Sequence, residues 1–415
     1  MSAIRNYALV TAAYWAFTLT DGALRMLVLL HFHNLGYTPV ELAFLFVFYE
    51  LFGVVTNLVG GFIAARLGLR ATLLGGLALQ VVALIMLALL GPTWGRVASV
   101  TYVMSAQALS GIAKDLTKMS AKSAIKVLVP KGADSSLFKW VSVLTGSKNA
   151  LKGVGFFLGG LLLGQLGFRG SLIAMAAGIS LTLAFSTVSL PRELGKAKNK
   201  AKFSQMFSKN RSVNVLSAAR FFLFGARDIW FVVGVPVFLA TQFDWGFMEV
   251  GGFLAAWVIG YGIVQSITPM LLKRFTGGRA PQGRSATVLA FLLALVIGGV
   301  VLGVHEGIRA DVLLVVGLGL FGVVFAINSA VHSYLILAYS DGDKVTMNVG
   351  FYYMANAGGR LAGTVLSGVM YEQTGLVGCL TASAMFALVA ALLAMMLPRT
   401  SGDFVLPEGV EVGGD

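Results

Sequence analysis

Two stretches decide how this chain folds: Lys152-GVGFFLGGLLLGQL-Gly167 and Arg360-LAGTVLSGVMYEQT-Gly375. Each is an apolar segment that starts with a cation, and five positions of one coincide with five of the other when the chain is shifted by 208 residues. The chain therefore carries an internal repeat of about half its length. Three further pairs fall at this shift or one residue from it: Asn57 with Gln265, Arg66 with Arg274, and Asp21 with Asp228.

The composition is that of a protein that crosses a membrane many times. The apolar residues AVILMFWYC make up 57% of the 415 positions and the charged residues DEKR only 12%, and mean hydropathy is +0.84. Apolar windows recur along the whole chain, each long enough at about 1.5 Å per residue to cross a hydrocarbon core about 30 Å thick. They predict twelve transmembrane helices, over residues 8–31, 40–64, 71–90, 97–121, 138–164, 171–190, 213–239, 250–272, 286–304, 312–338, 346–371 and 376–397.

The repeat and the spans together predict an all-α polytopic membrane protein made of two six-helix bundles with pseudo-two-fold symmetry. The N-terminal bundle covers residues 1–190 and the C-terminal bundle covers 213–397. A basic cytoplasmic linker, 191–212, joins them, and an acidic cytoplasmic tail follows at 398–415. In membrane proteins built from such repeats, substrate sites lie between the halves near the middle of the bilayer.

The distribution of Lys and Arg sets the orientation of the chain. With the N-terminus in the cytoplasm, 22 of the 31 Lys and Arg residues fall on the inner side, 3 in outer loops and 6 inside the spans. This asymmetry predicts a multi-pass protein of the bacterial inner membrane with both termini in the cytoplasm. Topology thus explains most of the net charge of +13, and nucleic acid is not an expected partner.

Ionisable residues also lie inside the spans, where they are expected only if they face a partner or a water-filled cavity. Counted at 1.5 Å per residue from the cytoplasmic end of each span, residues of four helices come to a similar depth, roughly 15–23 Å. This common depth predicts a charged site at the middle of the membrane. Its members are Asp21, Lys148, Lys152, Arg227, Asp228 and Arg360.

Toward the middle of the spans cations outnumber acids, by six to three. The surplus would be stabilised by a polyanionic substrate, because a buried charge needs a partner. Asp21, Glu50 and Asp228 are candidates for ion pairs and for proton coupling, because a carboxylate removed from water can titrate near neutral pH. The substrate-binding candidates are Arg25, Lys148, Lys152, Arg220, Arg227 and Arg360, with Tyr14, Asn328 and Asn356 as neutral hydrogen-bonding groups.

Purely structural roles compete with these assignments. Asp21 and Arg25 lie one helical turn apart, so they are also expected to pair with each other. Glu50 and Asn57 share a face of the second span, which fits bonds between helices slightly better than cavity lining. A stripe of lysines fits a solvated helix face better than a site, although its first two members are within reach of an inner vestibule. The stripe consists of Lys114, Lys118, Lys122 and Lys126.

Other chemistries are disfavoured. A single cysteine, Cys379, and four histidines without ligand spacing predict neither a metal nor another cofactor. No Walker motif occurs, so transport would be driven by an ion gradient or by exchange. No nucleophile–base pair indicates an enzyme. A drug exporter would have a less cationic cavity, and a non-transporting membrane sensor would carry an output domain beyond Arg399.

The loop Gly61-FIAARLGL-Arg70, between the second and third spans, resembles the signature loop of the major facilitator superfamily, in which it reads GxLaDRxGRR. Gly61, Arg66, Gly68 and Arg70 match that pattern, whereas Ala65 replaces its Asp. The resemblance implies alternating access by rocking of the two halves, with these four residues forming a cytoplasmic gating turn. In the family that Asp helps to latch one state, so Ala65 removes this interaction.

Two further segments, Tyr14-WAFTLTDGALRMLVLLHFH-Asn34 and Ala133-DSSLFKWVSVLTGSKNALKGVGFFLGG-Leu161, are similar to the organoarsenical efflux permeases of the ArsJ family. The resemblance implies an exporter of 1-arseno-3-phosphoglycerate that confers arsenate resistance. We expect the protein to be a monomer. The arsenylated substrate forms when glyceraldehyde-3-phosphate dehydrogenase uses arsenate in place of phosphate, so a functional link to this enzyme is implied. An organic-phosphate or sugar-phosphate exchanger of the same fold is the alternative, since its site would have the same chemistry.

The proposed substrate has two oxyanion ends, and the charged residues at mid-membrane offer cations for both. Lys148, Lys152, Arg227 and Arg360 would clamp these ends, with Arg25 or Arg220 at the margin. Arginine suits this role because its planar fork binds oxyanions through two hydrogen bonds. Proton coupling is the expected source of energy.

Overall fold

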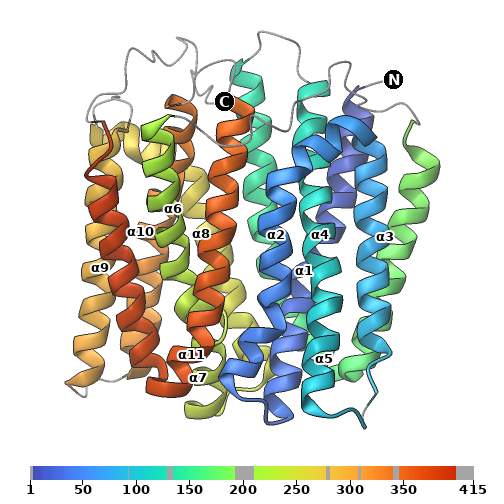
Figure 1. Ribbon diagram of the computed structural model, residues 1–415, viewed down its shortest axis with the longest axis horizontal. Coiled ribbons are helices and arrows are strands. Elements are labelled where there is room, and N and C mark those ends of the chain that lie inside the picture. Colours follow the sequence, from blue (N-terminus) through green and yellow to red (C-terminus); the bar gives the residue numbers. More distant parts are fainter. Residues whose placement is uncertain are drawn as a thin grey trace.

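The computed structural model describes residues 3–91, 93–128, 134–191, 210–276, 281–306, 310–339 and 345–398. These residues are almost entirely helical (Figure 1). The helices are α1 (Ala3–Asn34), α2 (Pro39–Leu67), α3 (Leu69–Ala88), α4 (Arg96–Leu128), α5 (Asp134–Ser189), α6 (Arg211–Phe231), α7 (Gly234–Gln242), α8 (Phe247–Thr276), α9 (Gly283–His305), α10 (Ala310–Ala338) and α11 (Val345–Ala394).

The two longest helices each turn back at one glycine. Gly167 in α5 and Gly375 in α11 both have φ of 67°, a left-handed conformation that glycine adopts without strain. Each of these helices therefore crosses the membrane twice, and α6 with α7 forms one crossing. The described helices thus make twelve crossings, which confirms the prediction from hydropathy. Two of them, α1 and α4, are not among the eight segments that length and composition alone identify as spans, and both carry charged residues of the central site.

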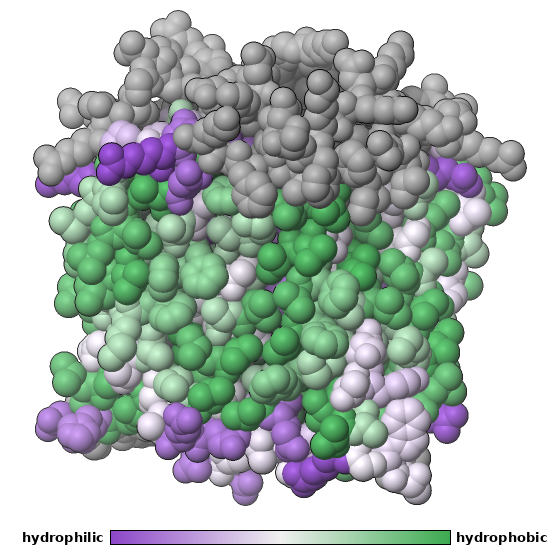
Figure 2. Space-filling view, viewed as in Figure 1, coloured by the Kyte–Doolittle hydropathy of each residue, from purple (hydrophilic) through white to green (hydrophobic). Residues whose placement is uncertain are grey.

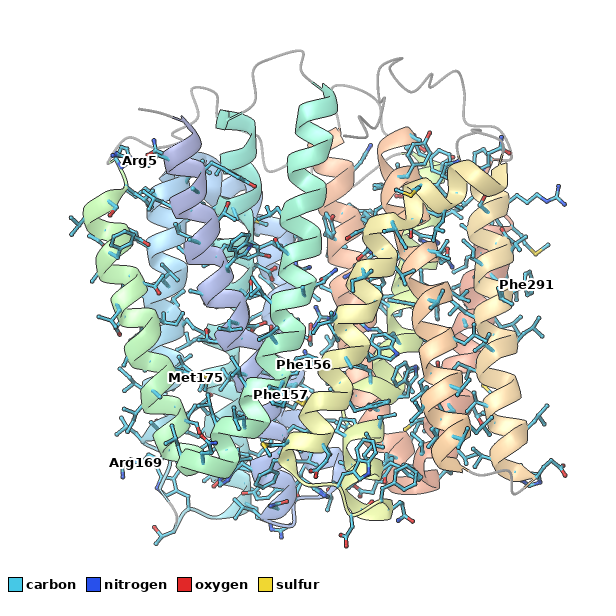
Figure 3. The ribbon with its side chains drawn as sticks, turned by 180° about the vertical axis from the view of Figure 1, so that it is seen from behind. Arg5, Phe156, Phe157, Arg169, Met175 and Phe291 are labelled. Atoms are coloured by element: carbon cyan, nitrogen blue, oxygen red, sulfur yellow. The ribbon has the colours of Figure 1, made fainter. Side chains whose placement is uncertain are left out.

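The crossings form two bundles side by side, α1–α5 in one and α6–α11 in the other (Figure 1). Helix α1 begins and α11 ends at the same face of the molecule, called here the terminal face; the opposite face is the distal face. An apolar belt lies between two polar rims in the space-filling view (Figure 2). Arg5 and Arg169 lie at opposite ends of the N-terminal bundle, at the two rims (Figure 3).

The repeat is visible in how the bundles pack. Across their interface α2 packs on α11 and α5 packs on α8. A Cβ on Gly160 would lie 2.2 Å from the Phe247 carbonyl oxygen, and a Cβ on Gly368 would lie 2.5 Å from that of Pro39. Phe247 and Pro39 are themselves 208 positions apart. The repeated glycines therefore allow close helix packing at equivalent points of both seams, as small residues do in membranes.

Apolar packing joins the bundles only toward the distal face among the residues that the structure describes. There one buried cluster runs through both bundles and includes Leu27, Phe156 and Trp230. Toward the terminal face each bundle has a buried cluster of its own, around Leu73 in the first and Leu335 in the second. The structure is thus a conformation closed toward the distal face.

The predicted gating turn lies at the terminal end of α2. Gly68, with φ of 83°, makes the tight turn into α3, and Arg70 Nη2 donates a hydrogen bond of 2.8 Å to the Thr187 carbonyl oxygen of α5. The surroundings of Gly61 and the side chain of Arg66 are outside what the structure describes. So are most of the predicted linker, 191–212, and of the predicted tail, 398–415.

Candidate functional site

A cavity of about 220 Å³ lies between the two bundles. Its walls come from both halves of the repeat, chiefly from α1, α4 and α5 on one side and α6, α8 and α11 on the other. Phe156, Phe231 and Trp257 line it and also belong to or pack on the apolar cluster that closes the distal side. The cavity therefore has an aromatic floor on the side of the distal face.

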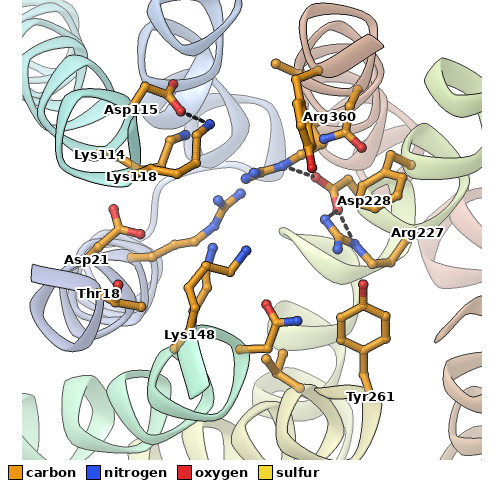
Figure 4. A pocket seen from close by; sticks show the side chains of 18 of the residues that line it. Thr18, Asp21, Lys114, Asp115, Lys118, Lys148, Arg227, Asp228, Tyr261 and Arg360 are labelled. Atoms are coloured by element: carbon orange, nitrogen blue, oxygen red, sulfur yellow. Dashed lines mark hydrogen bonds and ion pairs between the residues drawn. The ribbon is translucent and has the colours of Figure 1, made fainter. Parts of the chain in front are cut away.

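Eight cations line this cavity among the described residues, and three acids line it with them. Figure 4 shows Lys114, Lys148 and Arg360, from three helices, pointing into the same space. All six cations that the sequence predicts for the site are present. The cations are Arg25, Lys114, Lys118, Lys148, Lys152, Arg220, Arg227 and Arg360, and the acids are Asp21, Asp115 and Asp228.

A chain of ion pairs connects the arginines across the bundle interface. Glu50 Oε1 accepts from Arg25 Nη1 at 3.1 Å and from Arg360 Nη2 at 2.5 Å. Arg360 Nε also donates to Asp228 Oδ2 at 3.3 Å, and Arg227 Nε donates to the other oxygen of Asp228 at 2.6 Å. Glu50 is fully buried behind Arg25 and Arg360 and does not line the cavity, whereas Asp228 does. Three arginines are thus held by two carboxylates.

The pair expected between Asp21 and Arg25 is wrong. Arg25 binds Glu50, and Asp21 Oδ1 accepts a hydrogen bond of 2.6 Å from the Tyr49 hydroxyl. Both side chains of α1 turn toward α2, where Tyr49 and Glu50 are adjacent, so each takes a different partner. Asp21 still lines the cavity and is only 6% exposed.

The start of the lysine stripe lines the cavity and is not a solvated face. Lys118 Nζ donates to Asn57 Oδ1 at 2.7 Å and pairs with Asp115, and Lys114 Nζ lies 4.0 Å from the centre of the Tyr49 ring. The reason is that α4 continues to Leu128, beyond the predicted span end at 121, so both lysines lie well inside the helix and not at its end. Asn57 accordingly both bonds to α4 and lines the cavity. The side chains of Lys122 and Lys126 lie outside the described residues.

Asp115 is the acid that the sequence analysis missed. It is fully buried, and besides Lys118 it accepts a hydrogen bond of 3.3 Å from Asn57 Nδ2. The signal was present, because Asp115 is next to Lys114 in the same helix, but the helix end was placed too close to it. The count of three acids at mid-membrane was therefore one too low.

Arg220 differs from the other arginines in its partners. It is 4% exposed, it donates from Nε to Asn356 Oδ1 at 2.9 Å and from Nη1 to the Ser329 carbonyl oxygen at 3.1 Å, and its guanidinium lies 3.9 Å from the Phe224 ring centre. These acceptors are neutral. Asn356 lines the cavity, as expected for a polar group of the site.

The neutral groups of the site are only partly those expected. Tyr14 lines the cavity, but Asn328 does not: it is fully buried, and the side of α10 that faces Arg220 and the cavity carries Ser329 and Ser333 instead. Sequence reasoning could not fix this rotation of α10 about its own axis. Asn149 and Gln265, which join α5 to α8 through a hydrogen bond of 3.0 Å, also line the cavity.

The sequence profile of the Major Facilitator Superfamily matches residues 10–334. The chain belongs to the Major Facilitator Superfamily. Two solved structures with this fold are similar to it: a POT family transporter in complex with 5-aminolevulinic acid (TM-score 0.72, 14% identity, covering 94% of this chain and 95% of that one) and a D-xylose-proton symporter (TM-score 0.73, 13% identity, covering 96% and 99%). At this identity the likeness shows the fold alone. No curated protein matches the chain in sequence.

Membership of the Major Facilitator Superfamily, with a cavity between two repeated bundles, supports a role in secondary transport. Together with Glu50 behind the wall, four acids accompany the eight cations, a formal excess of four positive charges among the described residues. Lys152 is one of these eight cations and lies at the floor, where its Nζ is 5.7 Å from the Phe156 ring centre. Such a cavity can hold a small molecule that carries several negative charges.

Proposed function

We propose that this protein exports a small organic polyanion from the cytoplasm across the bacterial inner membrane, with 1-arseno-3-phosphoglycerate as its substrate. The observation that carries the proposal is the excess of four positive charges, counted over the described residues, around a cavity of about 220 Å³. A buried charge without a counterion is unstable, so an anion that enters the cavity gains more there than in water. The substrate class of the ArsJ family supplies such an anion.

The chemistry of this substrate fits the residues present. It carries an arsenate group and a phosphate group on a three-carbon unit, and its two oxyanion ends match cations that approach from both bundles. Arginines bind such groups through planar forks, and lysines bind them as compact charges. Pentavalent arsenic is an oxyanion and needs no thiolate, in keeping with Cys379 lying outside the cavity lining.

In the proposed transport cycle, this structure is the conformation that takes up substrate. The terminal face would be the cytoplasmic one, so the cavity, closed toward the distal face, would take its substrate from the cytoplasm and release it after the bundles rock. For proton coupling Asp21 is the best of the three candidate acids. It lines the cavity and is bonded to a neutral hydroxyl, whereas Glu50 and Asp228 are each held by two arginines.

Two other functions are alternatives to this proposal, and the cavity fits one of them better than the other. An organic-phosphate exchanger would use the same cations, so it is the alternative that the experiment has to separate. A drug exporter fits less well, because its pocket would be mostly apolar and roughly 300–1,000 Å³ in volume, whereas this cavity is smaller and cationic.

The test is uptake into everted membrane vesicles that contain the protein. Glyceraldehyde-3-phosphate dehydrogenase, its aldehyde substrate, NAD and arsenate outside the vesicles produce the arsenylated compound continuously, and vesicle arsenic is measured by mass spectrometry. Parallel vesicles receive arsenate alone, 3-phosphoglycerate alone, or phosphate in place of arsenate. Lys152→Ala removes a cavity cation, and Arg96→Ala is the matched control, because Arg96 pairs with Glu41 at the distal rim outside the cavity.

We expect arsenic to accumulate only with the complete mixture. Accumulation should be lost with Lys152→Ala and retained with Arg96→Ala. A protonophore is expected to stop accumulation. Exchange of 3-phosphoglycerate for phosphate without arsenic uptake would favour the exchanger, and absence of uptake of every anion would refute the proposal.

A further inference from the structure

One carboxylate of the structure is shared by the two bundles. Glu50 lies on α2, and its Oε1 atom accepts from Arg25 of its own bundle and from Arg360 of the other. Glu50 is fully buried and does not line the cavity, whereas both arginines do. An anion in the cavity therefore meets the two guanidinium groups but not the acid that holds them.

The pairing leaves hydrogen-bonding capacity unused. Glu50 Oε2 and Arg25 Nη2 are both buried and have no hydrogen-bond partner among the described residues. Arg360 divides its bonds between Glu50 through Nη2 and Asp228 through Nε. Glu50 thus holds both arginines through a single oxygen. A bound anion with several oxygens would offer the guanidinium groups of Arg25 and Arg360 more hydrogen-bond acceptors than Glu50 does.

The same pair of helices also closes the distal face. Along α2 and α11, Gly368 packs against the start of α2, and the Val40 amide donates to Glu372 Oε2 at 3.0 Å. Ala43, 1% exposed, lies in this seam, since a Cβ on Gly368 would be 2.5 Å from the Ala43 Cβ. The bond between Glu50 and Arg360 lies farther along this seam, at the cavity.

We infer that Glu50 is the internal counterion that the anionic substrate displaces from Arg360, and that this displacement allows α2 and α11 to separate at the distal face. The inference rests on the proposed function in one respect, that the substrate is an anion. With the cavity empty, separation would break the ion pair between Glu50 and Arg360 at low dielectric and leave each with only the partner in its own bundle, Arg25 and Asp228, so the closed state is favoured. With an anion bound, Arg360 keeps a partner, and occupancy is coupled to opening.

The experiment measures how fast a cysteine in the distal seam reacts with a maleimide. Ala43→Cys is made in a Cys379→Ala background, in the purified full-length protein in detergent. Leu35→Cys, at a position that is 54% exposed near the distal end of α1, reports the unhindered rate. Each protein is labelled without anion, with 3-phosphoglycerate, and with the arsenate-supplied dehydrogenase mixture. Glu50→Gln removes the charge of the counterion, and Glu50→Asp keeps it on a shorter side chain.

We expect slow labelling of Ala43→Cys without anion and about tenfold faster labelling with Glu50→Gln, as loss of one charge-assisted hydrogen bond shifts a two-state equilibrium by at least that factor. The dehydrogenase mixture is expected to accelerate labelling when Glu50 is present and to add little in Glu50→Gln. Glu50→Asp should respond to the anion, which a merely structural role would not predict.

Labelling of Glu50→Gln that is as slow as with Glu50 would overturn the inference, whatever the substrate. Equal acceleration by anion in both proteins would overturn it as well, because the anion would then act without displacing Glu50. A third outcome is fast labelling of Glu50→Gln together with no response to any anion when Glu50 is present. It would support the bond between Glu50 and Arg360 as the one that holds the seam closed, and it would count against the proposed substrate.

Discussion

The two bundles share one backbone plan but supply the cavity with different cations. The N-terminal bundle contributes four lysines and Arg25, and the C-terminal bundle contributes three arginines. Lys152 and Arg360 occupy equivalent positions of the repeat. The glycines beside them are retained: Gly155 packs on α1 as Gly363 packs on α6, each with a carbonyl oxygen close to where a Cβ would lie.

This difference shows which property each part of the repeat serves. Helix packing depends on backbone approach, so glycine is needed at the same positions in both halves. The cations face the cavity, and their side-chain types differ between the halves. In the C-terminal bundle fixed acceptors orient the guanidinium groups, Asp228 for Arg227 and Arg360 and Asn356 for Arg220. Lysines carry a compact charge on a flexible stem. The site therefore has an oriented side in the C-terminal bundle and a more adaptable, lysine-rich side in the N-terminal bundle, although Arg25 and Lys118 there have fixed acidic partners, Glu50 and Asp115.

Removing a cation of the adaptable side should have the largest effect on transport. For Lys152→Ala we expect the initial rate of arsenic uptake to fall about a hundredfold, since truncating one member of a buried charge pair costs about 3 kcal/mol. Uptake in everted vesicles, divided by the amount of protein in the membrane, measures it. A rate within threefold of that of Arg96→Ala would show that the lysine side does not bind substrate.

Exchanging the type of cation tests the contrast directly. A lysine in place of Arg360 cannot bond to Glu50 and Asp228 in the geometry of a fork, so Arg360→Lys should lower uptake about tenfold. Lys152→Arg should lower it only about threefold, because the lysine side adapts. The ratio of the two uptake rates is the measurement, and equal losses would contradict an oriented and an adaptable side.

Because the two seams are equivalent, adding a methyl group at either one should lower the stability of the protein by the same amount. Gly160→Ala and Gly368→Ala should each destabilise the protein by about 2 kcal/mol, the usual effect of overpacking, because their Cβ atoms would lie 2.2 and 2.5 Å from backbone oxygens. The midpoint of thermal unfolding in detergent should fall in both. Gly164→Ala and Gly178→Ala are the controls, since nothing lies within 4 Å of their Cβ positions, and they should not lower it.

The smallest effect on stability and uptake is expected from breaking the neutral hydrogen bond between the bundles. Asn149 and Gln265 join α5 to α8, whereas Glu50 and Arg360 join α2 to α11. Asn149→Ala should cost about 1 kcal/mol of stability, as a neutral hydrogen bond does, and change uptake by threefold at most. A loss as large as that of Lys152→Ala would mean that Asn149 itself binds the substrate. Thermal unfolding and uptake rates decide between these outcomes.

Twelve crossings, an internal repeat and a common depth of the charged residues could all be predicted from the amino-acid sequence. Hydropathy, length and the rise of a helix are properties of one helix at a time, so they can be read without knowing its neighbours. For the same reason all six predicted cations were found at the cavity. Glycines at one offset likewise predicted where helices approach each other.

The tertiary structure alone decided which groups meet. Glu50 is shared by Arg25 and Arg360, Asp21 bonds to Tyr49, and Asn328 is turned away from the cavity. These outcomes depend on the rotation of each helix about its axis relative to the next one, which no periodicity within one helix contains. The position of Asp115 depended in turn on where α4 ends, at Leu128. The depth of a charged residue along its helix can thus be predicted from the sequence, whereas its ion-pair and hydrogen-bond partners depend on how the helices pack.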